Sequence, residues 1–216
     1  MKKLLERLRK EELIGFLLEY AKSDPKFVNA VNVRFREPEF AEELKKIRYK
    51  IAKALDHVSD YSTHDSWGHV DFYIGDIVEE ILQRAGQGHI RLAFSEMELL
   101  YRKLLECFEY QGECEISDVA EYCCIEDMSK IAELAVSQED KEYIFGKCIE
   151  LAELEEGKDY GADYEDKLLS IAVKFVTSKN CEVLENAISR FDGTRREKEF
   201  KQIRMEIISR TEGEGI

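Results

Sequence analysis

The sequence predicts an all-α protein built as an irregular stack of antiparallel helix pairs. Apolar residues recur at helical spacing almost throughout the 216 residues, and strict alternation of apolar and polar residues is nearly absent. The chain holds only two prolines and 12 glycines, while 36% of its residues are charged and 44% are hydrophobic. This composition favours helices over the many short strands of a sandwich or barrel, and it is apolar enough to build a core.

Three helices are predicted before residue 59. The apolar stripe of the first consists of Leu13, Phe16, Leu17 and Tyr20. Asp24 is placed as the N-cap and Pro25 as the first residue of the next helix, over residues 25–35. The third helix has a continuous amphipathic face made of Phe40, Leu44, Ile47, Ile51, Leu55 and Val58.

A polar loop and a helix pair are predicted next. Residues 59–68 carry no apolar stripe and are rich in Ser, Asp, Thr and His, which is typical of a loop. Helical spacing returns over residues 70–85 and stops at the sequence Gly86-Gln87-Gly88, a pattern typical of a glycine C-cap. The partner helix is marked by Ala93, Met97, Leu100, Leu104, Leu105 and Phe108.

The second half of the chain continues the pattern. A helix over residues 119–135 can be capped within residues 117–118. Ser137, with Asp140 three residues later, resembles a capping box and begins a helix that runs to about residue 156. After a polar linker, further helices are predicted over residues 168–176, over residues 183–191 and around Phe200, Ile203 and Ile207.

Short connections make antiparallel neighbours the default, so we expect an αα-superhelix of stacked pairs. The pairs have unequal lengths and no fixed period, which indicates an irregular stack. We expect one helical-repeat domain over residues 1–211 and a disordered tail over residues 212–216.

The charge balance argues against several classes of partner and location. The chain has 46 acidic and 32 basic residues, a net charge of −14, which disfavours nucleic acid as a partner. The first ten residues carry charges throughout, unlike a secretory signal, and no apolar run is long enough to span a membrane. We therefore expect a cytoplasmic protein with reduced cysteines.

No catalytic residue and no cofactor is predicted. Phosphate-binding glycine loops, nucleophile elbows and Glu-x-x-His pairs are all absent. Paired carboxylates are abundant and are expected to lie on solvated helix faces. The six cysteines lack the close pairs of a structural zinc site, so we interpret them as small buried hydrophobes; they are Cys107, Cys114, Cys123, Cys124, Cys148 and Cys181.

The loop before residue 70 is the first place to look for a site, because it holds the only tryptophan and two of the four histidines. The candidate metal ligands are His64, Asp65, His69 and Asp71, whose side chains are competent for zinc or iron. Their spacing matches no metal signature. A structural interpretation explains them too: Asp65 or Ser66 caps the helix, Trp67 packs over its first turn, and the histidines are surface or hydrogen-bonded groups. An exposed Trp67 would instead be a candidate anchor for a partner.

A basic cluster near the C-terminus offers a second alternative. It consists of Arg190, Arg195, Arg196, Lys198, Lys201 and Arg204. These cations could contact phosphate, but Glu197 and Glu199 interrupt them and few aromatic residues lie between them. We expect a solvated helix whose charges form ion pairs within the chain.

Residues 10–21 and the following Ser23-Asp24-Pro25 resemble the helical region that follows the zinc finger in bacterial SWIM-type zinc finger proteins. Residues 67–72 and 88–94 extend the resemblance over the first half of the chain. The finger itself requires C-x-C followed by C-x-H, and neither pair occurs here. The resemblance therefore implies a helical region without its zinc ligands.

These observations lead to a non-enzymatic helical-repeat protein that mediates protein–protein interaction as the functional hypothesis. The alternatives are a metal-binding enzyme or sensor that uses the loop from His64 to Asp71, and a nucleic-acid-associated protein that uses the basic C-terminal helix.

Overall fold

Helices make up the regular secondary structure of the part of the chain that the computed structural model describes. That part comprises residues 9–24, 27, 39–60, 70–111, 124–153, 164–193 and 197–213. No β-strand occurs within these ranges, which confirms the predicted all-α class. Among the same residues, no helix combines the length and the apolar content needed to cross a membrane.

The chain divides into two compact units, residues 1–39 and residues 40–216, at a point where the sequence analysis placed no boundary. The first unit contains α2 (Lys10–Ser23). After α2, the backbone N–H of Phe27 donates to the carboxylate of Asp24 over 3.1 Å. This is the bond expected of an N-cap aspartate. The remainder of the predicted helix over residues 25–35 lies outside the described residues.

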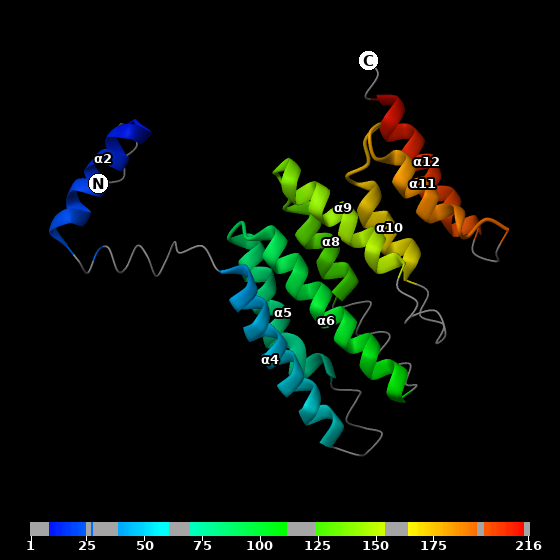
Figure 1. The fold of residues 1–216 in the computed structure, drawn as a ribbon, viewed down its shortest axis with the longest axis horizontal. Helices are drawn as coiled ribbons and strands as arrows, with labels where there is room; N and C mark the ends of the chain where they lie inside the picture. Colours follow the sequence, from blue (N-terminus) through cyan, green and yellow to red (C-terminus); the bar gives the residue numbers. More distant parts are fainter. Residues whose placement is uncertain are drawn as a thin grey trace. The chain divides into compact units, whose positions relative to one another are not determined.

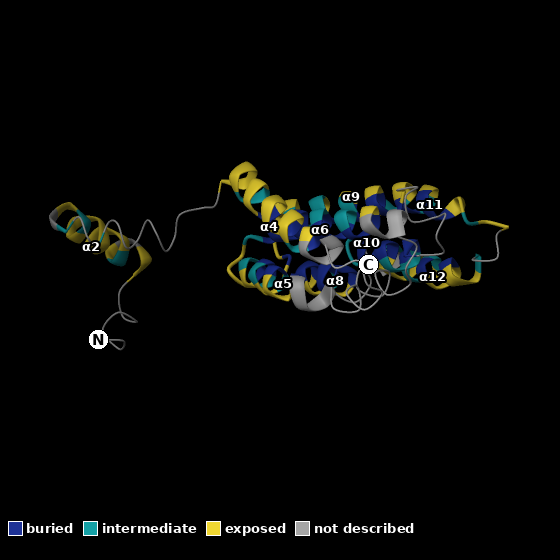
Figure 2. Ribbon diagram, turned by 90° about the horizontal axis from the view of Figure 1, so that it is seen from below, coloured by how far each residue is buried: buried dark blue, intermediate teal, exposed yellow. Residues whose placement is uncertain are grey.

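The second unit is a two-layered helical stack (Figure 1). Its helices are α4 (Phe40–Asp60), α5 (Val70–Gly86), α6 (Ile90–Gln111), α8 (Glu126–Glu133), α9 (Gln138–Ala152), α10 (Glu165–Val173), α11 (Cys181–Ser189) and α12 (Glu197–Gly213). Figure 2 shows α4, α6, α9 and α11 in one layer, with α5, α8, α10 and α12 in the other. The second unit is therefore a stack of helix pairs, as predicted.

Ion pairs between helices show whether two neighbouring helices run parallel or antiparallel. Lys50 pairs with Glu80, and the carboxylate of Glu43 lies 3.3 Å from the guanidinium of Arg84, so α4 and α5 are antiparallel. Helices α6 and α9 lie in one layer and run parallel, because pairs between them advance along both helices in the same direction.

The core runs along α6, where Phe94, Met97, Leu100 and Leu104 expose no surface. The predicted face of the preceding long helix contributes Ile47, Ile51 and Leu55, all buried. Phe40 departs from that prediction and is 41% exposed. Glu43 pairs with Arg84, which lies near the end of α5. Phe40 precedes Glu43 by about one turn of α4. Because α4 and α5 are antiparallel, Phe40 lies beyond Arg84, where the connection to α6 begins.

Two predicted helix ends are confirmed by their hydrogen bonds. At the end of α5 the N–H groups of Gly88 and His89 donate to the carbonyls of Ala85 and Arg84 over 2.9 and 3.1 Å. Gly88 has φ +92°, the left-handed conformation of a glycine cap. At the start of α9 the hydroxyl of Ser137 accepts from the N–H of Asp140 over 3.0 Å.

Several helices end at other positions than predicted. Helix α9 ends at Ala152 and not near residue 156, and α11 ends at Ser189 and not at residue 191. Helix α8 ends at Glu133, where the N–H groups of Leu134 and Ala135 bond to carbonyls three residues back, and the cap at Ser137 then begins α9. Helix α10 ends at Val173 with the same tight turn through residues 174–176. Helix α12 extends to Gly213, two residues into the predicted tail. Buried apolar residues thus continue past the helix ends into turns.

Candidate functional site

Most of the predicted metal site lies outside the described residues. His64, Asp65 and His69 belong to the range 61–69, as does Trp67, while Asp71 lies in the first turn of α5. The metal site and the Trp67 anchor therefore stay predictions. Within the described ranges, no group of three or more His, Cys, Asp or Glu side chains is placed to hold a metal ion.

Two of the cysteines are buried, as the sequence predicts. Cys124 and Cys148 expose no surface, whereas Cys181 is partly exposed. Burial raises the pKa of the Cys148 thiol far above its ordinary value. The thiolate, which is the nucleophilic form, is therefore strongly disfavoured at Cys148. The side chains of Cys107, Cys114 and Cys123 lie outside the described set.

Three of the four described cations of the basic cluster form ion pairs within the chain, as expected, whereas Lys198 is exposed and forms no ion pair with a described residue. Arg190 lies 2.7 Å from Glu153, and Lys201 lies 3.2 Å from Glu197. Arg204 holds Asp192 over 2.7 Å, and this contact lowers the pKa of the Asp192 carboxyl. Arg195 and Arg196 lie outside the described residues.

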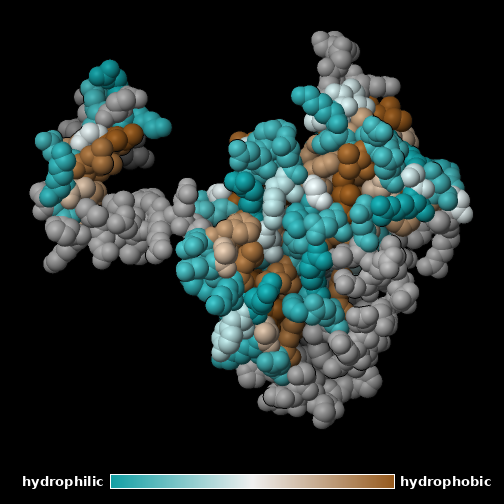
Figure 3. All heavy atoms as spheres, viewed as in Figure 1, coloured by the Kyte–Doolittle hydropathy of each residue, from teal (hydrophilic) through white to brown (hydrophobic). Residues whose placement is uncertain are grey.

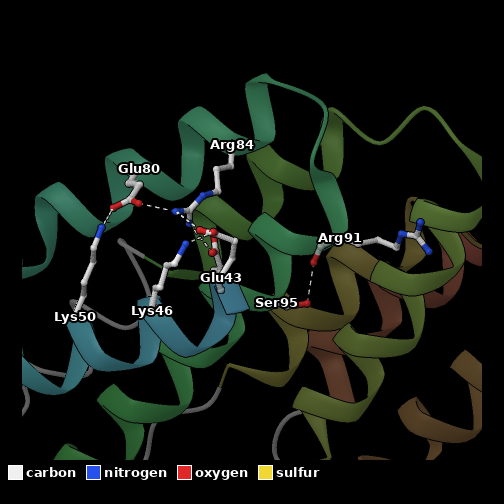
Figure 4. A network of polar contacts seen from close by, with 8 residues as sticks. Glu43, Lys46, Lys50, Glu80, Arg84, Arg91 and Ser95 are labelled. Atoms are coloured by element: carbon white, nitrogen blue, oxygen red, sulfur yellow. Dashed lines mark hydrogen bonds and ion pairs between the residues drawn. The ribbon is translucent and has the colours of Figure 1, made fainter. Parts of the chain in front are cut away.

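The most buried polar group of the second unit joins α4, α5 and α6 (Figure 4). Arg84 on α5 contacts three carboxylates: Glu80 and Glu96, each over 2.5 Å, and Glu43 over 3.3 Å. Glu96 has no exposed surface, and its Oε2 atom has no hydrogen-bond partner among the residues that the structure describes. Burial raises the pKa of the Glu96 carboxyl, and the guanidinium of Arg84 opposes that effect.

Lysines on α4 extend this network toward solvent. Lys46 contacts Glu43 over 2.6 Å, and Lys50 contacts Glu80. The hydrogen bond from Lys46 lowers the pKa of the Glu43 carboxyl. The network therefore consists of carboxylates matched by cations around one partly buried guanidinium, and we interpret it as an ion-pair network that holds three helices together.

A second polar seam joins α6 to α9 in the same layer. It consists of the pairs Arg91–Asp140 (3.2 Å), Ser95–Tyr143 (2.5 Å), Glu98–Lys147 (3.5 Å) and Arg102–Glu150 (2.8 Å). The members advance by three or four residues on both helices, so one polar stripe faces another. The hydrogen bond from Lys147 lowers the pKa of the Glu150 carboxyl.

Sequence reasoning missed both polar groups, because charge runs were interpreted as solvated faces. A signal was present for Glu96. It lies three residues after Ala93 and four before Leu100, in the middle of the predicted apolar stripe. A carboxylate at such a position must be paired or protonated when the stripe is buried. Nothing in the sequence identified Arg84 as its partner.

Two surface clefts open beside α10. The first, of about 270 Å³, lies between α8 and α10 and includes Ser129, Lys167 and Ser170 in its lining. The second, of about 360 Å³, lies where the first turns of α9, the turn after α10 and the end of α12 meet. We call the second cleft the α9–α10–α12 cleft. Its lining consists of Gln138, Lys141, Glu142, Lys174, Phe175, Val176, Thr177 and Arg210.

The α9–α10–α12 cleft combines apolar and cationic side chains. Val176 is buried and Phe175 is partly buried, because the turn after α10 carries them past the helix end. Arg210 is held in place by Glu206 over 2.8 Å and by a bond to the carbonyl of Lys174 over 3.2 Å. Lys141 forms no ion pair with any residue that the structure describes.

Comparison with protein-family models, with curated proteins and with solved structures returned no match to this chain. The function is therefore argued from the geometry above.

Proposed function

We propose that this protein is a non-enzymatic binding protein whose helical stack docks an acidic segment of another protein. The observation that carries the proposal is the α9–α10–α12 cleft, in which Lys141, Lys174 and Arg210 surround apolar Phe175 and Val176. An apolar anchor with acidic neighbours would complement this lining, because the anchor covers the apolar residues while the carboxylates meet the cations.

The charge of the chain makes this cleft distinctive. The net charge is −14, so most of the surface repels an acidic partner. The lining of the cleft holds three cations and one carboxylate, Glu142. Lys174 and Arg210 already pair with Glu133 and Glu206 over 3.0 and 2.8 Å, so the excess positive charge of the cleft lies at Lys141. Glu142 already accepts a hydrogen bond from Gln138 over 2.8 Å. Lys141 has no carboxylate partner within the described residues, so its ammonium group is available to a ligand.

A protein segment fits the cleft better than a small substrate does. Small-molecule sites orient their ligand with a few fixed polar groups inside a largely enclosed pocket. Here every polar side chain of the lining is exposed or partly exposed, and the buried member is Val176. Such an arrangement supports binding of an extended surface, and it offers no paired acid and base for catalysis.

The proposal is tested by site-specific photo-crosslinking in the native cell, with the crosslinker at Thr177 in the cleft lining. The captured protein is identified, purified and titrated against the wild type and against Lys141→Glu. We expect Lys141→Glu to weaken binding by about tenfold or more, because it places a carboxylate where the partner carries one.

The matched control is Lys53→Glu, which reverses an exposed lysine on α4 that also lacks an ion pair among the described residues. It changes the net charge by the same amount, so it should leave affinity nearly unchanged. Equal losses in both variants would show a general charge effect. Unchanged binding by Lys141→Glu would remove the cleft from the interface.

A further inference from the structure

Helix α2 presents large apolar side chains to solvent over most of its circumference. Its exposed members are Ile14 (46%), Phe16 (59%), Leu17 (39%), Leu18 (62%) and Tyr20 (46%). Figure 3 shows a band of apolar surface along one face of α2. At 100° per residue, the apolar positions between residues 13 and 21 cover an arc of about 200°. A helix that packs on its own core needs only about half of that arc.

The first unit offers no internal crosslink that would hold α2 in place. A segment of the size of residues 1–39 usually needs disulfides, a metal or association to be stable. Residues 1–39 contain neither cysteine nor histidine, so disulfides and the usual zinc ligands are excluded. Packing against another apolar surface is the means left to cover the apolar arc.

We propose that two copies of this chain associate through the apolar faces of their α2 helices. A second α2 helix is the described surface of this chain that matches α2 in length and character. In the second unit the exposed large apolar side chains are dispersed: Phe40, Tyr49, Leu134, Val136, Val183, Met205 and Ile208. A face that pairs with itself about a two-fold axis is the commonest way in which homo-oligomers form.

The charges of α2 permit two copies to approach. Residues 9–23 carry three basic and three acidic side chains, which sum to zero, whereas the whole chain carries −14. Contact at α2 therefore joins neutral segments and leaves the acidic parts of the two copies free to stay apart. Because the contact is apolar, its strength should depend little on salt.

Sedimentation velocity of the full-length chain tests the proposal over roughly a hundredfold range of protein concentration. We expect the wild type to reach twice the monomer mass. The double variant Phe16→Glu/Leu18→Glu should raise the dissociation constant by about tenfold or more, because it places carboxylates in the apolar contact. Both side chains are exposed within the chain, so the variant loses no buried contact.

Two controls keep the outcome decisive. Met205→Glu changes a comparably exposed apolar residue on α12, 66% exposed, and should leave the dimer intact. Leu18→Gln tests the same face without a charge and should weaken the dimer less than the double variant does. A wild type that stays monomeric, or a dimer that Met205→Glu disrupts and the α2 variants spare, overturns the proposal. A monomer that co-sediments with anionic lipid vesicles overturns it in favour of a membrane surface.

Discussion

At the scale of single residues, the pair of the buried Glu96 and the partly buried Arg84 is the feature with the largest consequences for stability. Glu96 exposes no surface, and Arg84 is its partner at 2.5 Å. A buried ion pair adds little net stability compared with apolar residues, but removal of one member leaves a charge without compensation. The two residues are therefore expected to respond unequally to substitution.

We predict that Arg84→Met destabilises the protein by about 3–5 kcal/mol, because Glu96 loses its partner. Glu96→Gln should cost no more than about 1 kcal/mol, since the amide oxygen still accepts from Arg84, and Arg84 keeps Glu80 and Glu43. The double variant should be more stable than Arg84→Met alone. Urea unfolding at neutral pH measures all three, and simple additivity of the two single changes would contradict the coupling.

The stability lost in Arg84→Met should depend on pH, because the Glu96 carboxyl can be protonated. Burial raises the pKa of Glu96 in the folded protein, and loss of Arg84 removes the effect that opposes it. The folded state then binds the proton more tightly than the unfolded state does, so stability is lost as pH rises from the ordinary pKa of a glutamate to the raised pKa, and it recovers as pH falls back through that range. We predict that the difference in unfolding free energy between Arg84→Met and the double variant Glu96→Gln/Arg84→Met shrinks on acidification. A constant difference across the acidic range would argue against a buried charged Glu96.

At the scale of helices, the ends are fixed by local backbone chemistry and the faces by packing. Gly88 at the end of α5 has φ +92°, while Gly75 lies inside the same helix with ordinary geometry. A Cβ atom added at either position would meet no heavy atom within 4 Å. The two glycines therefore differ in backbone conformation alone, which makes them a matched pair.

We predict opposite effects of alanine at these two positions. Gly88→Ala should destabilise the protein by about 1–2 kcal/mol, because alanine pays the left-handed penalty. Gly75→Ala should stabilise it by about 0.5–1 kcal/mol, because glycine weakens a helix interior. Thermal unfolding followed by circular dichroism measures both. A loss of stability at Gly75 equal to that at Gly88 would show that space and not backbone conformation decides.

At the scale of the whole molecule, the core belongs to the second unit. Its buried cluster starts at Ile47 and ends at Ile207, and no buried apolar residue of the first unit contributes to it among the described residues. The ion-pair network around Arg84 and the polar seam between α6 and α9 also lie within residues 40–216. The second unit therefore has what an independently folding domain needs.

We predict that the chain truncated to residues 40–216 folds with a cooperative unfolding transition and a midpoint close to that of the full-length protein. The reason is that the truncation removes no residue from the core cluster. Chemical unfolding monitored by circular dichroism measures the midpoint. A truncated chain without a cooperative transition would mean that the first unit contributes to the core.

The sequence by itself determined the helical class, most of the helices and their buried stripes. The stripe of α4, the glycine cap at Gly88 and the serine cap at Ser137 were all recognisable, because each depends on residues close together in the chain. Such local patterns indicate which face of a helix is apolar and at which helix end a side chain or a turn must satisfy the backbone groups that lack a partner within the helix.

Only the tertiary structure decided which polar residues meet. The partners Arg84 and Glu96 come from different helices, the seam of α6 and α9 joins residues 48 or 49 positions apart, and the α9–α10–α12 cleft gathers residues from three helix ends. Such contacts depend on how one helix is set against another, and a periodic stripe of apolar residues fixes the buried face without fixing the neighbour. For the same reason the sequence predicts an apolar stripe on α2 without deciding whether another surface covers it, and only the structure shows that large apolar side chains of α2 are exposed.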